Sequence, residues 1–119
     1  MTDMVNNPPH YQDASGIQCI EVTKFLGFCD GNCFKYLYRA GQKGDAIEDL
    51  EKAKWYAKQA KDMGVGAITD QDIIGKIWKI AFYRKNYIML AMHSIAEGEW
   101  DRVINYIDKE LEKWLKSEI

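Results

Sequence analysis

The sequence predicts a small all-α protein, a helical bundle of about five helices with an irregular N-terminal segment. From Ile17 onward, apolar residues recur at three- and four-residue spacings, and no stretch has the strict alternation of a β-strand. Both prolines lie at positions 8 and 9, which leaves everything after them free to be helical. With 119 residues, 47% of them hydrophobic, residues 1–119 are expected to form a single domain with one core.

The first half of the chain predicts three helices. A short amphipathic helix should begin near residue 17 and stop around Gly27. A second helix is expected over residues 32–40, with Asp30 as its N-cap, because aspartate accepts hydrogen bonds from the free N–H groups of a helix start. Residues 45–48 carry the Asp-x-x-Glu capping-box pattern, which predicts a third helix over residues 46–63.

The second half predicts a fourth helical region, capped by Thr69 and continuing to about Ala96, and a last helix that begins near Trp100. Residues 83–86 are a kink or a turn, so the fourth region is one helix or two. These segments hold three of the four tryptophans. Such a wide apolar face is typical of an oligomer seam, although the tryptophans equally fit a cover for the bundle. Residues 69–119 are therefore expected to serve packing and homo-oligomerisation.

Charge and composition exclude several classes of protein. The net charge of -2 disfavours duplex DNA, whose binders need a surplus of basic residues. No stretch approaches the ~20 apolar residues of a membrane span, and the N-terminus lacks a signal peptide. The three cysteines are an odd number and are read as small buried thiols in preference to zinc ligands. A cytoplasmic protein is expected, with no membrane partner.

A basic face on the second predicted helix is the strongest functional signal. Asn32, Lys35, Tyr36 and Arg39 stand at positions i, i+3, i+4 and i+7, so they share one side of a helix. Lysine and arginine one turn apart repel each other, and a phosphate between them would remove that cost. Taken alone, the pattern is more typical of a solvated cationic face that pairs with Asp49 or Glu51 of the next helix.

Other residues nearby could complete a nucleotide site. Lys43 lies in the following glycine turn, and Lys52 either pairs with a carboxylate or joins the phosphate site. Trp55 and Tyr56 are able to stack on a base, although each could equally be core. His10 is a candidate general acid–base or phosphate donor near the N-terminus.

Two familiar kinds of nucleotide site fit the sequence less well. The G-x-x-x-x-G-K-[ST] sequence of a P-loop does not occur. The all-helical nucleotide pyrophosphohydrolases need two acidic pairs on facing helices to hold magnesium. Glu48 and Glu51 could form one such pair, but no matching Glu-x-x-Asp follows. The missing second acidic pair weakens the pyrophosphohydrolase alternative without eliminating it.

Four motifs in order resemble the SaV-like family of small phage proteins, which includes a coliphage nucleotide kinase that phosphorylates deoxynucleoside monophosphates without a P-loop. The motifs are Asn7-Pro-Pro-His-Tyr11, Gly16-Ile-Gln-Cys-Ile-Glu-Val22, Gly31-Asn-x-x-Lys-Tyr-x-x-Arg-Ala-Gly-x-Lys43 and Glu48-Asp-Leu-x-Lys-Ala-x-Trp-Tyr56. The resemblance implies that residues 5–62 form the nucleotide-site region. It implies a site made of His10, Tyr11, Asn32, Lys35, Arg39 and Lys43.

The leading hypothesis is therefore a nucleotide kinase that moves a phosphoryl group from a nucleoside triphosphate to a deoxynucleoside monophosphate. In it, Lys35, Arg39 and Lys43 neutralise the phosphates, while Asn32 and Tyr36 orient them. Asp49 or Glu21 would accept a proton or hold Mg²⁺, whose requirement the sequence leaves open; no metal site is assigned. The alternatives are a non-catalytic protein that sequesters nucleotides and an inhibitor of a host enzyme. The inhibitor would act through Trp100 and Trp114.

Overall fold

The computed structural model describes residues 13–117, and this range contains six α-helices and no β-strand. The all-helical class predicted from the sequence is confirmed. The helices are α1 (Ile20–Thr23), α2 (Phe28–Arg39), α3 (Ala46–Met63), α4 (Gln71–Phe82), α5 (Asn86–Glu97) and α6 (Trp100–Ser117). Two of the predicted site residues, His10 and Tyr11, lie outside the described residues.

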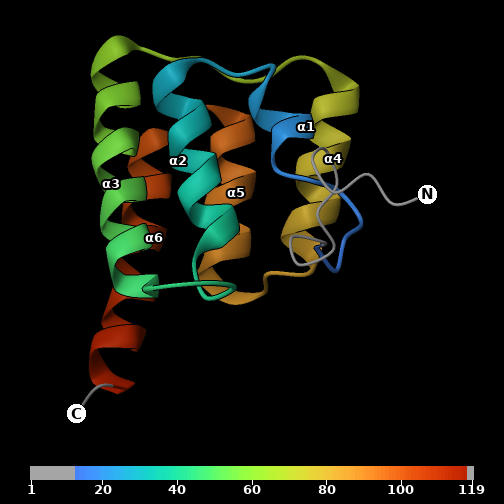
Figure 1. The fold of residues 1–119 in the computed structure, drawn as a ribbon. Helices are drawn as coiled ribbons and strands as arrows, with labels where there is room; N and C mark the ends of the chain where they lie inside the picture. The colour runs from blue at the N-terminus through green and yellow to red at the C-terminus, as the bar shows by residue number, and fades with distance from the viewer. Residues whose placement is uncertain (1–12, 118–119) are drawn as a thin grey trace.

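The six helices form two layers of three (Figure 1). In one layer α2 packs between α3 and α1, and in the other α5 packs between α6 and α4. Across the layers, α3 contacts α6, α2 contacts α5 and α1 contacts α4. The core lies between the layers, and α6 extends beyond the end of α3 (Figure 1).

Each of the longer helices gives a stripe of apolar side chains to that core. The largest fully buried residues include Phe34 and Leu37 of α2, Leu50 of α3, and Met92 and Ile95 of α5. The stripe of α3 is otherwise made of alanines, and such small side chains let neighbouring helices approach closely. Burial of these stripes is the main favourable contribution to folding.

The start of α2 differs from the sequence prediction. The helix begins at Phe28 with Gly27 as its N-cap, four residues before the predicted start at residue 32. Asp30, predicted to be the cap, lies inside the first turn, where a carboxylate also complements the helix dipole. Its Oδ1 lies 2.8 Å from where a Cβ on Gly27 would stand, so the glycine makes room for the carboxylate.

The predicted first helix is much shorter than expected. Only Ile20–Thr23 is α-helical, whereas the pattern extended from residue 17 to Gly27. The chain continues through tight turns, in which the N–H groups of Phe25 and Leu26 donate to carbonyls three residues earlier. Phe25 is exposed, so the apolar periodicity that suggested a longer helix does not reflect burial there.

The α3 start matches its prediction, because the Asp45 side chain accepts a hydrogen bond from the Glu48 N–H. The N-cap predicted for α4 is wrong by one residue. Asp70, not Thr69, accepts hydrogen bonds from the N–H groups of Asp72 and Ile73. Both residues suit a cap, and sequence alone did not separate them.

The fourth predicted region is two helices. Lys85 and Asn86 have φ angles of 64° and 50°, which breaks the helical path between α4 and α5. The N–H groups of Tyr83 and Arg84 still donate to the carbonyls of Ile80 and Ala81, so α4 ends in a tight turn. This turn lets α5 fold back along α4.

Two of the tryptophans expected at an oligomer seam are used inside the chain. Trp100 is buried, and its indole N–H donates to the Val65 carbonyl at 2.8 Å. Trp114 is half-buried, donates to Glu110 and lies 3.4 Å from where a Cβ on Gly41 would stand. The inhibitor hypothesis needed both residues to contact a host enzyme. Trp100 is buried and therefore offers no surface for that contact.

None of the helices in the described part of the chain combines the length and apolar character required to cross a bilayer.

A buried ion pair fastens the N-terminal end of the described chain to the α4–α5 turn. The side chains of Arg84 and Asp13 are 2% and 4% exposed, and the guanidinium donates to the Asp13 carboxylate. It also donates to the Tyr38 carbonyl at 3.1 Å and lies over the Tyr38 ring. Burial raises the pKa of Asp13, but hydrogen bonds from Arg84 and Ser15 outweigh it, so the pKa is lowered overall.

Removing the guanidinium should destabilise the fold. We expect Arg84→Ala to lower the free energy of unfolding by about 3–5 kcal/mol, because it leaves a buried carboxylate without its partner. Urea unfolding measures this. Arg102→Ala, which removes an exposed arginine, is the matched control and should stay within about 0.5 kcal/mol of wild type. Equal effects of the two variants would contradict the structural role of the pair.

The pair should also make stability depend on pH. Because the folded pKa of Asp13 is lowered, its contribution is present above the ordinary aspartate value of about 3.9 and is lost as pH falls through the lowered value. The stability difference between wild type and Asp13→Asn should therefore shrink as the pH is taken from about 5 toward 2. A difference that grows on acidification would show that the pKa is raised instead.

Candidate functional site

The outer face of α2 carries the basic residues because its inner face is committed to the core. Cys33, Phe34 and Leu37 are fully buried. Lys35 and Arg39 are exposed, as the predicted spacing requires. The same outer face runs beside α3, whose residues complete the surface. We call this surface the α2–α3 face and define it by Lys35, Tyr36, Arg39, Asp49, Lys52 and Tyr56.

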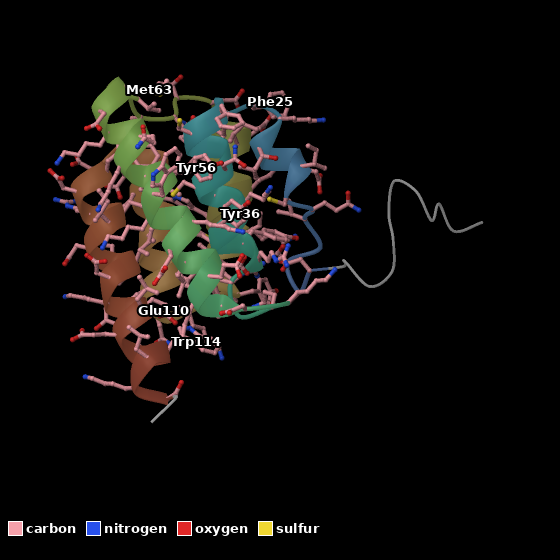
Figure 2. All side chains as sticks on the ribbon, turned by 60° about the vertical axis from the view of Figure 1, so that its left-hand side comes forward. Phe25, Tyr36, Tyr56, Met63, Glu110 and Trp114 are labelled. Atoms are coloured by element: carbon pink, nitrogen blue, oxygen red, sulfur yellow. The ribbon has the colours of Figure 1, made fainter. Side chains whose placement is uncertain are left out.

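Two stacked tyrosines lie at the middle of the α2–α3 face (Figure 2). The rings of Tyr36 and Tyr56 have centroids 6.0 Å apart and planes inclined by 11°. The ammonium groups of Lys35 and Lys52 lie 4.7 Å and 5.5 Å from the centroid of the Tyr36 ring. Both distances are within the range of cation–π attraction, so the ring gathers one lysine from each helix.

The two lysines differ in their counter-ions. Lys52 Nζ lies 2.7 Å from the Glu48 carboxylate, one helical turn away, and this ion pair raises the pKa of Lys52. Within residues 13–117, no carboxylate lies at ion-pair distance from Lys35. Lys35 is therefore the ammonium group on this face whose charge remains available to an anion.

Arg39 connects the end of α2 to the start of α3. Its Nε lies 3.4 Å from Asp49 Oδ2, and its side chain is 49% exposed while that of Asp49 is 6% exposed. One side of the guanidinium rests on Gly44, where a Cβ would come within 2.9 Å of Nη2. Glycine at this position has a φ of +71° and leaves room for the guanidinium. Arg39 is thus held in place while half of it still faces solvent.

Asp49 is a buried carboxylate with incomplete hydrogen bonding. Its Oδ2 is at ion-pair distance from Arg39 but has no hydrogen-bond partner of good geometry in the described chain. Burial raises the pKa of Asp49, and the charges of Arg39 and Lys52 only partly offset that effect. The carboxyl group is therefore easier to protonate than an ordinary aspartate.

Aromatic surface extends the α2–α3 face toward the start of α2. Phe28 and Trp55 meet the Tyr56 ring edge-on, at centroid distances of 5.7 Å and 5.0 Å. They are 74% and 56% exposed, so both present ring surface to solvent. Sequence reasoning missed Phe28 because it started the helix at Asn32. The Asn32 side chain itself donates to the Phe28 carbonyl at 2.7 Å.

The remaining predicted site residues are placed differently. Glu21 accepts from the Gln18 N–H and lies 3.9 Å from Lys76, so it faces α4 and not the α2–α3 face. Lys43 is exposed in the turn between α2 and α3. Asp49 is therefore the predicted carboxylate that the structure brings next to Arg39.

The three cysteines are free thiols, and Cys33 is fully buried. Burial raises the pKa of Cys19 to about 12 and raises that of Cys33 as well, which keeps both protonated near neutral pH. In the described range, no three histidine, cysteine or acidic side chains gather as metal ligands would.

Comparison with known proteins adds an independent line of evidence. Residues 5–58 match a family model described as a protein of unknown function (DUF3310). The nucleotide kinase gp1.7 of Escherichia phage T7 is 39% identical over 62 residues, and the gene 1.7 protein of Enterobacteria phage T3 is 37% identical over 62 residues. No solved structure matches the chain.

The similarity is local. Each alignment spans 44% of this chain, 32% of the T7 protein and 38% of the T3 protein. The chain thus covers about a third of the length of these relatives. The matched family region contains the whole α2–α3 face, including both tyrosines, and it confirms the resemblance that the motifs indicated. Residues 5–58 are thus similar to the DUF3310 family, and this part of the chain is distantly similar to a phage nucleotide kinase.

Proposed function

We propose that the chain is a nucleotide-kinase-like phosphotransferase that binds nucleotide phosphates on the α2–α3 face. In this proposal the donor is a nucleoside triphosphate and the acceptor is a deoxynucleoside monophosphate. Its main support is the arrangement of Arg39, which is fixed against Asp49 and Gly44 yet half exposed beside Lys35 and the stacked tyrosines. The similarity to the T7 nucleotide kinase supports the same choice of chemistry.

The arrangement suits phosphoryl transfer because that reaction depends mainly on positioning and on charge stabilisation. Arg39 offers a planar fork of N–H donors to phosphate oxygens, and Lys35 adds a compact positive charge. Lys43 and Lys52 add further positive charge, and the Tyr36 hydroxyl and Asn32 would help to orient the phosphates. Preorganisation of Arg39 matters, since a guanidinium already held in place loses less freedom on binding.

The aromatic part of the face would hold the base. Trp55 and Phe28 present exposed rings beside Tyr56, and stacking on aromatic rings tolerates any nucleobase. Asp49 would serve as proton acceptor or as an oxygen ligand for magnesium accompanying the triphosphate. Of the two acidic residues that the sequence offers, Asp49 takes this role in preference to Glu21, which faces Lys76.

Arg39→Ala should abolish phosphoryl transfer, with a loss of about 100-fold or more, because charge stabilisation of the transferred group is lost. Arg39→Lys keeps the charge but not the planar fork, and it should recover only part of the activity. Arg102→Ala is the control for loss of an exposed arginine. Product nucleotides are separated by chromatography, and circular dichroism checks that helicity is unchanged.

Turnover at the wild-type level in Arg39→Ala would remove Arg39 from the mechanism. Wild-type protein that binds nucleotides tightly but forms no product would instead support the non-catalytic, sequestering alternative. That outcome would contradict the kinase proposal while keeping the α2–α3 face as a binding site.

The buried Asp49 carboxyl should leave a signature in the dependence of stability on pH. Because its folded pKa is raised, its stabilising contribution is present below the ordinary aspartate value near 3.9 and is lost as pH rises through the raised value. Asp49→Asn removes this loss, so the variant should gain stability relative to wild type as pH rises from about 3.5 to 7. Urea unfolding at several pH values measures the difference, and a relative loss on raising pH would contradict a raised pKa.

We also propose that the chain forms homo-oligomers through the outer face of α4. Trp78 and Phe82 are 59% and 70% exposed on that helix, and Tyr83 follows with its ring against Phe82. Helix α4 lies at the edge of its layer (Figure 1), and Trp78 stays largely exposed although its ring meets His93 of α5 edge-on. Contiguous exposed aromatic surface of this kind is typical of protein–protein contacts.

Trp78→Glu together with Phe82→Glu should convert the assembly to monomers, because two charges would be buried at the contact. Light scattering coupled to gel filtration measures the mass. Lys58→Gln together with Lys116→Gln, which changes the net charge by the same two units at exposed positions outside α4, is the charge control. If wild type is monomeric at about 100 μM, or if the aromatic double variant keeps the wild-type mass, the α4 contact is wrong.

A further inference from the structure

A second pair of stacked tyrosines lies in the other layer, between α5 and α6. The rings of Tyr87 and Tyr106 have centroids 6.3 Å apart and planes inclined by 20°. The ammonium groups of Lys109 and Lys113 lie 5.7 Å and 5.8 Å from the centroid of the Tyr87 ring. We call this group the α5–α6 cluster. None of its four residues belongs to the face described above.

The α5–α6 cluster repeats the tyrosine–lysine part of the α2–α3 face, although both of its lysines come from α6 and it has no counterpart of Arg39 and Asp49. In both, one ring of a near-parallel tyrosine pair gathers two lysine ammonium groups within 6 Å, the range of cation–π attraction. The elements correspond as well, because α2 and α5 have 12 residues each and α3 and α6 have 18. Helices α2 and α5 contact each other, as do α3 and α6, so the two pairs stand back to back.

The charges of the two groups are balanced in the same way. In the α5–α6 cluster, Lys113 lies 3.6 Å from the Glu110 carboxylate, as Lys52 lies beside Glu48 on the other face. For Lys109, as for Lys35, the described residues provide no carboxylate at ion-pair distance. Asp108, which precedes Lys109 in sequence, is 2.7 Å from Lys54 of α3. In each group, one of the two lysines at the tyrosine ring is thus paired with a carboxylate and the other is not.

Such a cluster is chemically suited to a nucleotide. Two lysines drawn to one ring repel each other, and a phosphate between them would relieve that repulsion. The tyrosine rings are half-buried, so a planar base has partly exposed aromatic surface on which to stack. An anion without an aromatic group would satisfy only the lysines, whereas a nucleoside phosphate satisfies both features.

We infer that the α5–α6 cluster is a second nucleotide-binding site, which takes the phosphates of a nucleotide on Lys109 and Lys113. This inference rests on the contacts within α5 and α6 alone and does not require that the α2–α3 face be catalytic. Because the two faces belong to opposite layers, one nucleotide cannot contact both in the same chain (Figure 1). The chain should therefore bind two nucleotides.

Equilibrium dialysis with ATP tests the inference on the full chain. Wild type should bind two ATP molecules per chain. Lys109→Ala with Lys113→Ala should lose one of them, with an affinity loss of at least about tenfold at that site. Lys35→Ala with Lys52→Ala should lose the other, and the quadruple variant should lose both. Lys58→Ala with Lys79→Ala removes two exposed lysines from other surfaces and should retain both sites.

The possible failures are distinguishable. Wild type that binds one ATP, which the Lys35 and Lys52 substitutions abolish, would overturn the second site and leave the proposed function intact. In a second outcome, wild type binds one ATP that is lost only when Lys109 and Lys113 are substituted. That result would overturn the α2–α3 proposal. Weakening equal to that of the Lys58 and Lys79 control, or no ATP binding at millimolar concentration, would overturn the inference. Tripolyphosphate as the probe should bind at least about tenfold more weakly than ATP, because it lacks the stacking base; equal affinity would contradict a nucleotide site.

Discussion

The arrangement of the candidate site depends on the burial of α2. This helix packs against α3 and α1 within its layer and against α5 in the other layer. Cys33, Phe34 and Leu37 fill that contact completely, so the helix cannot rotate without exposing them. Rotation is what would move Lys35 and Arg39 away from α3. The apolar contact therefore fixes the direction of the basic residues more firmly than any of their own ion pairs.

The charges around α2 explain why the basic face is neither fully neutralised nor fully free. Asp49 is buried and draws Arg39 toward α3, while Gly44 leaves room for the guanidinium. Exposed ion pairs contribute little, so Lys52 with Glu48 adds only a small stabilisation. The more strongly buried pair is Asp13 with Arg84, whose guanidinium also donates to the Tyr38 carbonyl near the end of α2. This most buried ion pair uses none of the residues that define the α2–α3 face.

Features that depend on residues close together in sequence could be predicted well from the sequence. The capping box at Asp45 and Glu48 involves residues three apart, and the structure forms it as predicted. The shared face of Lys35 and Arg39 follows from helical spacing alone. The family resemblance is likewise confirmed, because it was carried by a dense run of motif residues between positions 31 and 43.

Features that depend on tertiary packing could not be predicted in the same way. The sequence pattern predicts that Gly27 ends a helix, but in the structure it is the N-cap of α2. The lack of a side chain at Gly27 leaves room for the Asp30 carboxylate. That misplaced start hid Phe28 from the candidate site. Trp100 and Trp114 looked equally fit for an interface, and only the packing of α6 shows that Trp100 lies in the core. The α5–α6 cluster joins Tyr87 to Lys109 and Lys113, which are too distant in sequence to form a motif.

The central claim is that the α2–α3 face holds the phosphates of a nucleotide. Backbone amide chemical-shift mapping by NMR, with a deoxynucleoside monophosphate as the titrant, tests it most directly. The claim predicts saturable shifts in residues 32–39 and 44–56, including the Arg39 side-chain N–H. Saturable shifts elsewhere in the chain, with these two segments unmoved, would contradict it.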